Sequence, residues 1–213
     1  MHAKPVIPFD FFDPLVEFGT GALNGTMELT GGFGFGMLVR HGISNTFSFE
    51  TGISQIRRGY AWQLVNDTNG FAADDRIRYI GYEIPVTGLV FVRLGERSYM
   101  NASLGASLDM YPSDAVREVV DARAFMSRSG WAQFGLNGNL GFEYRTERSG
   151  IIYLGATYHR AFGDMAQATL TWFSPRTGLP SNISTPLAGS YLTLDLRYLF
   201  HEDPNRERVR KNK

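Results

Sequence analysis

The sequence contains no cysteine, carries no net charge and has no long apolar run. Without cysteine, disulfide frameworks, thiolate metal sites and cysteine nucleophiles are excluded. A formal net charge of +0 at pH 7 gives no overall field that would attract nucleic acid, which is not expected as a partner. No apolar run approaches the ~20 residues that a transmembrane helix needs. These absences leave either a soluble protein or one that crosses a membrane with strands.

Helical periodicity is also nearly absent, and strict alternation takes its place. In residues 98–110, Met100, Leu104 and Leu108 alternate with polar residues such as Asn101 and Asp109. This segment is longer than an ordinary strand of about 5–6 residues and matches the ~9–11 residues that a tilted strand needs to cross a bilayer. The same alternation recurs in residues 32–40, 46–56, 133–145, 151–159 and 191–200.

The connections between these segments predict the order of the strands. Short turns are expected at residues 40–45, 94–97 and 146–149, and long loops at 61–74, 111–130 and 163–189. Short turns on one side and long loops on the other are typical of outer-membrane barrels. With a first strand near residues 16–24, the sequence predicts an all-β fold, an eight-stranded antiparallel transmembrane up-and-down β-barrel. Residues 166–173 alternate too, either as an extension of the seventh strand or as a hairpin in the last loop.

Three parts follow from this reading. They are an N-terminal periplasmic segment (1–15), the barrel (16–200) and a basic periplasmic tail (201–213). The alternative is a soluble β-sandwich or lipocalin-like barrel, in which the aliphatic face would point inward. Glycines on the polar face of residues 32–36 and 135–141 fit a tight interior better than a solvated surface, which favours the membrane barrel.

The stretch "YIGYEIPVTGLVFV", residues 79–92, carries a glutamate and a proline within an apolar run. Its Tyr82, Glu83, Ile84 and Pro85 resemble the "Y-x-E-I-P" motif of strand four in a Bacteroidota outer-membrane β-barrel family that includes PorT-like proteins, with a tyrosine spacing one residue shorter. The resemblance extends over about residues 16–200, and it implies an eight-stranded outer-membrane barrel. It implies no single function, because a fold does not determine one.

Alternation assigns Glu83 to the lumen and Ile84 to the outer face. Pro85 cannot donate a ladder hydrogen bond, so a bulge or local bend is expected there. Such a bulge would allow a change of phase, because the residues that follow fit either face.

The same alternation places several other charged residues on the inward face of the predicted barrel. Since an unpaired buried charge is costly, these side chains are expected to pair and to fill the narrow lumen. A gated proton or ion path is the alternative. The predicted lumen charge network consists of Glu50, Glu83, Asp109, Glu143, Arg145, Asp195 and Arg197.

Aromatic residues near the strand ends predict girdles at the two membrane interfaces. The termini are rich in aromatic or basic residues and are expected to dock a partner. The predicted girdle residues are Trp62, Trp131, Trp172, Tyr198 and Phe200, and the predicted docking residues are Phe9, Phe11, Phe12, Arg206, Arg208 and Arg210.

The leading hypothesis is a non-enzymatic outer-membrane barrel of a Gram-negative bacterium, with both termini periplasmic and no cofactor or metal. It would act as a structural or accessory subunit of a secretion or transport complex, with other envelope proteins as partners. Membrane lipid and lipopolysaccharide are further expected partners, the latter through outer arginines such as Arg57 and Arg78. The alternatives are a surface-binding or adhesion barrel acting through its loops, and a lipid-A-modifying enzyme using His41 or His159.

Overall fold

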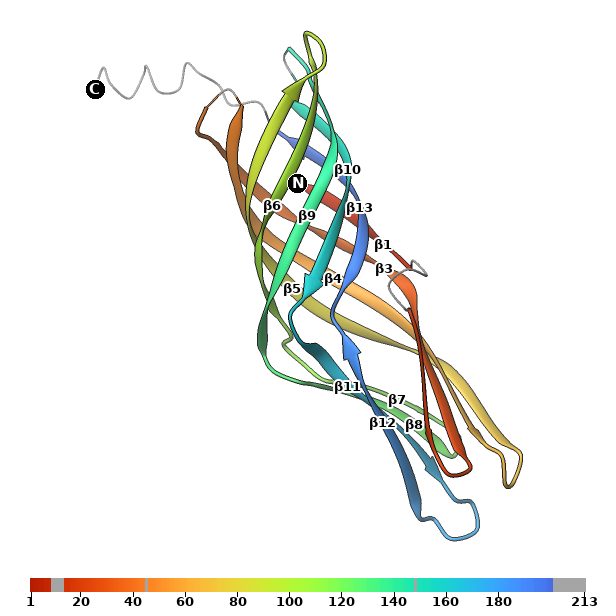
Figure 1. Cartoon of the computed structure of the whole chain (residues 1–213). Coiled ribbons are helices and arrows are strands. Elements are labelled where there is room, and N and C mark those ends of the chain that lie inside the picture. Colours follow the sequence, from red (N-terminus) through yellow and green to blue (C-terminus); the bar gives the residue numbers. More distant parts are fainter. Residues whose placement is uncertain (9–13, 45, 148, 201–213) are drawn as a thin grey trace.

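The computed structural model describes residues 1–8, 14–44, 46–147 and 149–200, which fold into thirteen strands. This described part of the chain contains no helix that is long and apolar enough to cross a membrane. Eight strands hydrogen-bond into a closed ring, and the other strands build a body that projects from one end of it (Figure 1).

The ring follows the chain order, so each strand is antiparallel to the next. The predicted all-β class and the closed antiparallel arrangement of eight strands are confirmed. The short turns at residues 40–45, 94–97 and 146–149 are confirmed as well, because strands end and begin on either side of each. The ring consists of β1 (His2–Ile7), β3 (Leu23–Gly42), β4 (Phe47–Asn66), β5 (Phe71–Arg93), β6 (Ser98–Met110), β9 (Ala132–Arg145), β10 (Ile151–Ala161) and β13 (Tyr191–Leu199).

The prediction that residues 16–24 form the first strand of the ring is wrong. β1 closes the ring between β13 and β3, so residues 2–7 belong to the ring and not to a separate N-terminal segment. Pro5 faces outward opposite Phe33, and the β1–β13 ladder has no pairs at Lys4 and Pro5. A proline removes one donor but still permits the pairing on its other side. Residues 9–13 lie outside the described residues.

The predicted long loops are also wrong, because their residues form strands. β3, β4 and β5 continue past the ring, and β2 (Leu15–Thr20) pairs with the continuation of β3. A second sheet has the order β12 (Pro180–Ala188), β11 (Asp164–Phe173), β8 (Ala122–Arg128) and β7 (Ala115–Val119). Since β11 pairs with β12, residues 166–173 belong to a hairpin, one of the two predicted alternatives. The projecting body consists of this second sheet and, facing it, β2 with the continuations of β3, β4 and β5 beyond the ring (Figure 1).

The projecting body has an apolar core between its sheets. Bulky side chains come from β3, β4 and β5, among them Met27, Trp62 and Leu64, all at most 2% exposed. Small side chains face them from the second sheet, with Ala124 and Ala168 both at 0% exposure. Packing large residues against small ones lets the two layers come close without voids. Here the apolar residues face inward, as the soluble sandwich alternative expected for the whole chain.

A bulge lies where β3 passes from the ring into the body. The β3–β4 register shifts between Leu29 and Gly31, and Thr30 donates a hydrogen bond from its side chain to the carbonyl of Gly59. Gly31 has a φ of 119°, which side chains of L-residues rarely adopt. Because a bulge bends a strand, this one redirects β3 at the boundary.

No bulge occurs at Pro85, contrary to the prediction. The β4–β5 ladder lacks pairs at Ile84 and Pro85, yet it resumes at Glu83 in the same register. Thr51 donates its side-chain hydroxyl to the Pro85 carbonyl at 2.8 Å. The phase is unchanged, so Glu83, Thr87 and the residues at alternate positions to Phe91 all face inward.

The core predicts a large effect for Trp62→Ala. Deleting the buried indole leaves a cavity, so the free energy of unfolding is expected to fall by about 3–5 kcal/mol. Denaturant unfolding followed by limited proteolysis of the body measures this loss. Val120→Ala is the matched control, because Val120 is 84% exposed. A Trp62→Ala protein as stable as the control would contradict the assignment of Trp62 to the core.

Candidate functional site

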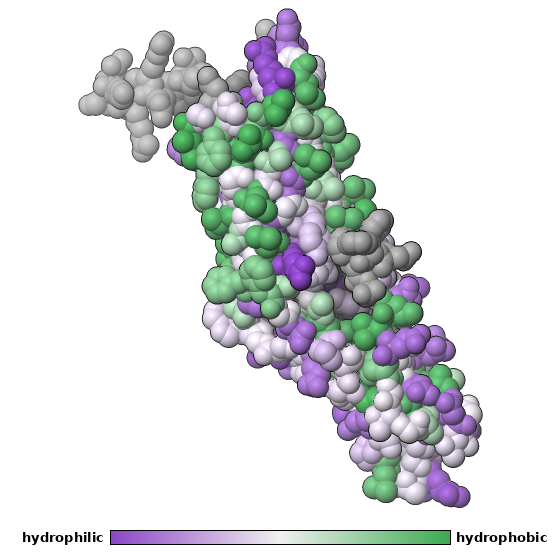
Figure 2. Space-filling model, in the orientation of Figure 1, coloured by the Kyte–Doolittle hydropathy of each residue, from purple (hydrophilic) through white to green (hydrophobic). Residues whose placement is uncertain are grey.

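The outer face of the ring is apolar over the length of its strands. Figure 2 shows apolar side chains over the ring and a more hydrophilic surface over the projecting body on the face in view. This apolar outer face includes Phe33, Phe35, Met37, Val39, Phe47, Phe49, Ile53, Val86, Val90, Val92, Leu104, Phe134, Leu140, Phe142, Ile152, Leu154, Leu194 and Leu196, all exposed by more than a third.

The interior of the ring is charged and buried. Five carboxylates are buried in the described residues, and each lies within salt-bridge distance of a cation or a histidine. Pairing of this kind offsets the cost of removing charges from water. The five carboxylates are Glu50, Glu83, Asp109, Glu143 and Asp195.

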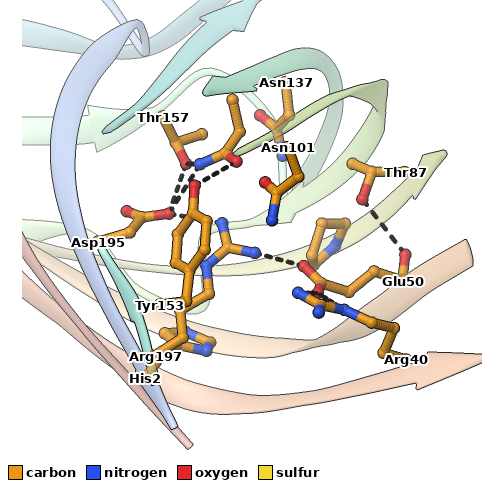
Figure 3. A network of polar contacts seen from close by, with 12 residues as sticks. His2, Arg40, Glu50, Thr87, Asn101, Asn137, Tyr153, Thr157, Asp195 and Arg197 are labelled. Carbon is orange, nitrogen blue, oxygen red and sulfur yellow. Dashed lines mark hydrogen bonds and ion pairs between the residues drawn. The ribbon is translucent and has the colours of Figure 1, made fainter. Parts of the chain in front are cut away.

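Two arginines connect three of these carboxylates, and Figure 3 shows both arginines with Glu50 and Asp195. Arg40 donates to Glu50 at 3.2 Å and to Glu143 at 2.5 Å. Arg197 donates to Glu50 at 2.5 Å and to Asp195 at 2.6 Å. Glu50 therefore accepts from both arginines, and the pairs form a continuous chain across the ring.

Asp195 is the most extensively hydrogen-bonded of these groups. Thr157 and Thr193 donate their hydroxyls to its two oxygens at 2.6 and 2.7 Å. Tyr153, fully buried, lies beneath the Arg197 guanidinium, whose carbon is 4.7 Å from the ring centroid. The Tyr153 ring occupies the space that a Cβ on Gly155 would fill. The glycine inner face that the sequence suggested thus makes room for an aromatic side chain.

Glu83, the charged residue of the motif, is held by partners from three strands. Lys4 lies 3.6 Å from it, Asn137 donates to it at 2.5 Å, and the Tyr191 hydroxyl donates at 2.9 Å. The partner of Glu83 is thus a lysine from β1. The other motif residues alternate as predicted: Tyr82, like Ile84, lies on the outer face, while Pro85 is buried.

His159 does not form a hydrolytic triad. Its Nε2 lies 3.1 Å from the Ser107 hydroxyl and 2.8 Å from Asp109, and its ring stacks on Tyr191 at 4.6 Å. In a hydrolytic triad the serine and the acid contact opposite nitrogens of the imidazole, whereas both contact the same nitrogen here. His159 is 1% exposed, so the cluster also lies away from the surface.

Arg58 is a buried residue that the sequence predictions did not include in the lumen. It is 2% exposed and has no carboxylate within salt-bridge distance among the described residues. It donates to the Gly189 carbonyl at 2.9 Å and lies over the rings of Tyr111 and Tyr191. The sequence signal that could have placed Arg58 inside is its parity, since Arg58 and Glu50 both lie at even-numbered positions of β4. Arg58 ties the β12–β13 connection to the ring.

All seven predicted lumen residues lie on the inner face, with Arg145 at the rim, where it donates to Glu143 at 2.8 Å. Of the predicted girdle residues, Trp131, Tyr198 and Phe200 are exposed, and their place at a membrane interface stays a prediction. Trp62 is buried in the body and Trp172 packs against the same core, so the assignment of these two is wrong. The predicted docking residues Phe9, Phe11, Phe12, Arg206, Arg208 and Arg210 lie outside the described residues.

An ion pair joins the two sheets of the body at one edge. Arg117 on β7 donates to Asp75 on β5 at 2.6 Å. The bond from Arg117, together with the backbone amide of Arg76, lowers the pKa of Asp75. The contact therefore persists above the ordinary carboxyl pKa and is lost as pH falls through the lowered value. An inward-pointing charge at a sheet edge also discourages pairing with other chains.

Among the described residues, no group of three or more acidic or histidine side chains could hold a metal ion. A comparison with family models finds no match for the chain, and a comparison with curated proteins finds none either.

The charge chain predicts a strong effect for Arg197→Met. Removing this guanidinium leaves Glu50 and Asp195 without their shared partner, so the free energy of unfolding is expected to fall by about 3–5 kcal/mol. Denaturant unfolding in detergent measures the change. Arg97→Met is the control, because the exposed Arg97–Glu147 pair is expected to contribute about 0–1 kcal/mol. Equal effects of the two changes would contradict a network that holds the ring together.

Proposed function

We propose that the chain is a membrane-spanning β-barrel of a Gram-negative outer membrane, with the ring in the bilayer and the projecting body on its outer side. It acts without enzymatic activity, as a structural or accessory subunit of an envelope complex. The observation that carries the proposal is the reversed polarity of the ring, which exposes apolar side chains and buries paired charges.

The extent of the apolar face supports a lipid environment. Soluble monomers rarely expose contiguous apolar patches of more than a few hundred Å². Here exposed apolar residues occur on seven of the ring strands, from β3 to β13. β6, β9, β10 and β13 have 13, 14, 11 and 9 residues, close to the ~9–11 that cross a bilayer.

The filled interior supports an anchoring role over a conducting one. Arg40, Arg197 and Tyr153 project into the middle of the ring and contact side chains from other strands (Figure 3). A ring of eight strands is just wide enough for side chains to fill it. The closed lumen leaves the projecting body as the part available to a partner.

The body also presents apolar residues at its far end. Val120 and Leu179 are 84% and 68% exposed, and they lie in the turns of the β7–β8 and β11–β12 hairpins. Exposed apolar residues on an ordered β-structure, away from the apolar face of the ring, suit contact with another protein.

The docking role predicts a partner that depends on these turns. After cross-linking in native membranes, the wild-type chain is expected to co-purify with a protein in fixed stoichiometry. Val120→Asp with Leu179→Asp is expected to reduce its recovery at least about tenfold, because charges oppose burial of the turns. Glu96→Gln, in an exposed turn at the opposite end, is the control. A lone wild-type monomer would contradict the accessory role and favour surface binding of ligands from outside the cell.

The membrane location predicts different accessibility for two tryptophans. With the other tryptophans changed to phenylalanine, brominated lipid in reconstituted vesicles is expected to quench the fluorescence of Trp131 strongly. Trp62 is expected to be quenched little, because it is 2% exposed and lies in the body, while Trp131 is 69% exposed at the end of the ring. Steady-state fluorescence measures both. Solubility of the chain without detergent, or the absence of Trp131 quenching, would contradict the proposed membrane location.

A further inference from the structure

A chain of polar side chains crosses the apolar outer face of the ring. Gln55 and Tyr82 lie on the outer parity of β4 and β5, where the neighbouring outward residues include Ile53 and Ile80. The side-chain amide of Gln55 donates to the Tyr82 hydroxyl at 2.8 Å, and Arg57 Nε donates to the side-chain oxygen Oε1 of Gln55 at 2.8 Å. Folding of the ring does not require polar groups at these positions.

Arg57 is turned toward the apolar face and away from the body. Its Nε is fixed by Gln55, and its guanidinium carbon lies 5.7 Å from the centroid of the Phe35 ring. A lone arginine at a membrane surface would extend toward water. Here the terminal guanidinium nitrogens have no carboxylate within salt-bridge distance among the described residues.

A second cation lies beside Arg57. Arg78 is exposed and outward on β5, opposite Gly59, so it is the diagonal neighbour of Arg57 on the adjacent strand. Diagonal neighbours on one face of a sheet are about 7–8 Å apart at the backbone, within reach of long side chains. Arg76 follows two residues further from the apolar face.

An apolar groove adjoins this row of polar side chains. It has a volume of about 440 Å³ and is lined by Phe35, Gly36, Met37, Ile53, Gln55 and Tyr82, together with the first two residues. Phe35, Met37 and Ile53 are 47%, 62% and 44% exposed, so their apolar surfaces are open along the groove. The groove thus places an apolar channel next to the amide of Gln55 and the hydroxyl of Tyr82, and Arg57 is hydrogen-bonded to that amide.

We propose that this groove binds one acylated, phosphorylated lipid of the outer leaflet, the lipid A part of lipopolysaccharide. The lipid phosphate accepts hydrogen bonds from Arg57 and Arg78, its ester region lies against Gln55 and Tyr82, and an acyl chain occupies the groove. Charge complementarity favours this occupant, because arginine pairs well with phosphate and the adjoining surface is apolar. The inference rests on the proposed membrane location.

Binding is tested on the detergent-purified full chain by native mass spectrometry. The probes are lipid A, zwitterionic phosphatidylcholine and inorganic phosphate. One lipid A is expected to bind per chain, at least about tenfold tighter than phosphatidylcholine. Since each arginine near a membrane surface contributes about 1 kcal/mol toward anionic lipid, Arg57→Gln with Arg78→Gln is expected to weaken binding roughly tenfold to thirtyfold.

Matched variants distinguish lipid binding in the groove from a general effect of surface charge. Arg93→Gln with Arg97→Gln removes two exposed cations from the opposite end and is expected to leave binding unchanged. Gln55→Leu with Tyr82→Phe keeps every charge and is expected to weaken binding about threefold to tenfold. Arg78→Gln alone, at an exposed residue, serves if the double arginine variant does not fold.

Three results would overturn the inference. They are unchanged binding after loss of Arg57 and Arg78, equal affinity for the two lipids, and inorganic phosphate binding as tightly as lipid A. Failure of the membrane location is recognised separately, because the wild-type chain would then be recovered in the soluble fraction. A protein that inserts into vesicles but binds all lipids equally would contradict lipid binding in the groove and would leave the membrane location standing.

Discussion

The pairing of buried charges inside the ring is the interaction on which the rest of the structure depends. Glu50 accepts from Arg40 and from Arg197, which come from β3 and β13 on the two sides of β1. An uncompensated buried charge costs several kcal/mol, so this arrangement is stable only when the ring is closed and all partners are in place. Closure in turn depends on β1, a six-residue strand that contributes Lys4 to Glu83. Electrostatics thus couples the shortest strand of the ring to the motif residue on the opposite side.

The second constraint is the strict alternation of β4 and β5 through two environments, whereas β3 changes parity at its bulge. On β4 the buried positions run from Glu50 and Ser54, inside the ring, to Trp62 and Leu64 in the body, with no change of parity. Side chains on one face of a strand must therefore be polar at one end and apolar at the other. Arg58 lies at the junction, where its guanidinium meets two tyrosine rings and a backbone carbonyl. Such contacts suit a cation that has apolar residues on one side and polar residues on the other.

The sequence was sufficient for the ring wherever alternation was long and regular. β6, β9 and β13 follow the predicted inward and outward residues, and the charged residues assigned to the lumen all lie there. The first strand was missed because six residues with a proline give too short a pattern to outweigh the strong alternation that follows. Trp62 was misplaced because aromatic residues near strand ends suggest a girdle, although its parity with Glu50 already put it inside. Contacts such as Lys4 with Glu83 join residues far apart in the chain, and no local pattern predicts them.

The body and the outer face of the ring impose opposite demands on similar strands. In the body, polar side chains face outward and the core is dry, as in a soluble sandwich; in the ring, the polar groups are inside. The boundary between them is marked by the bulge at Thr30 and by the arginines that follow Ile80 toward the body. Acidic outward residues begin at the level of Arg76, where Glu28 lies on β3, and continue to Asp74 on β5. The outer surface therefore changes along the strands from apolar to basic and then toward acidic. In the proposed membrane location, anionic headgroups would match the first two of these zones and repel the third, and this would set the depth of the ring in the bilayer.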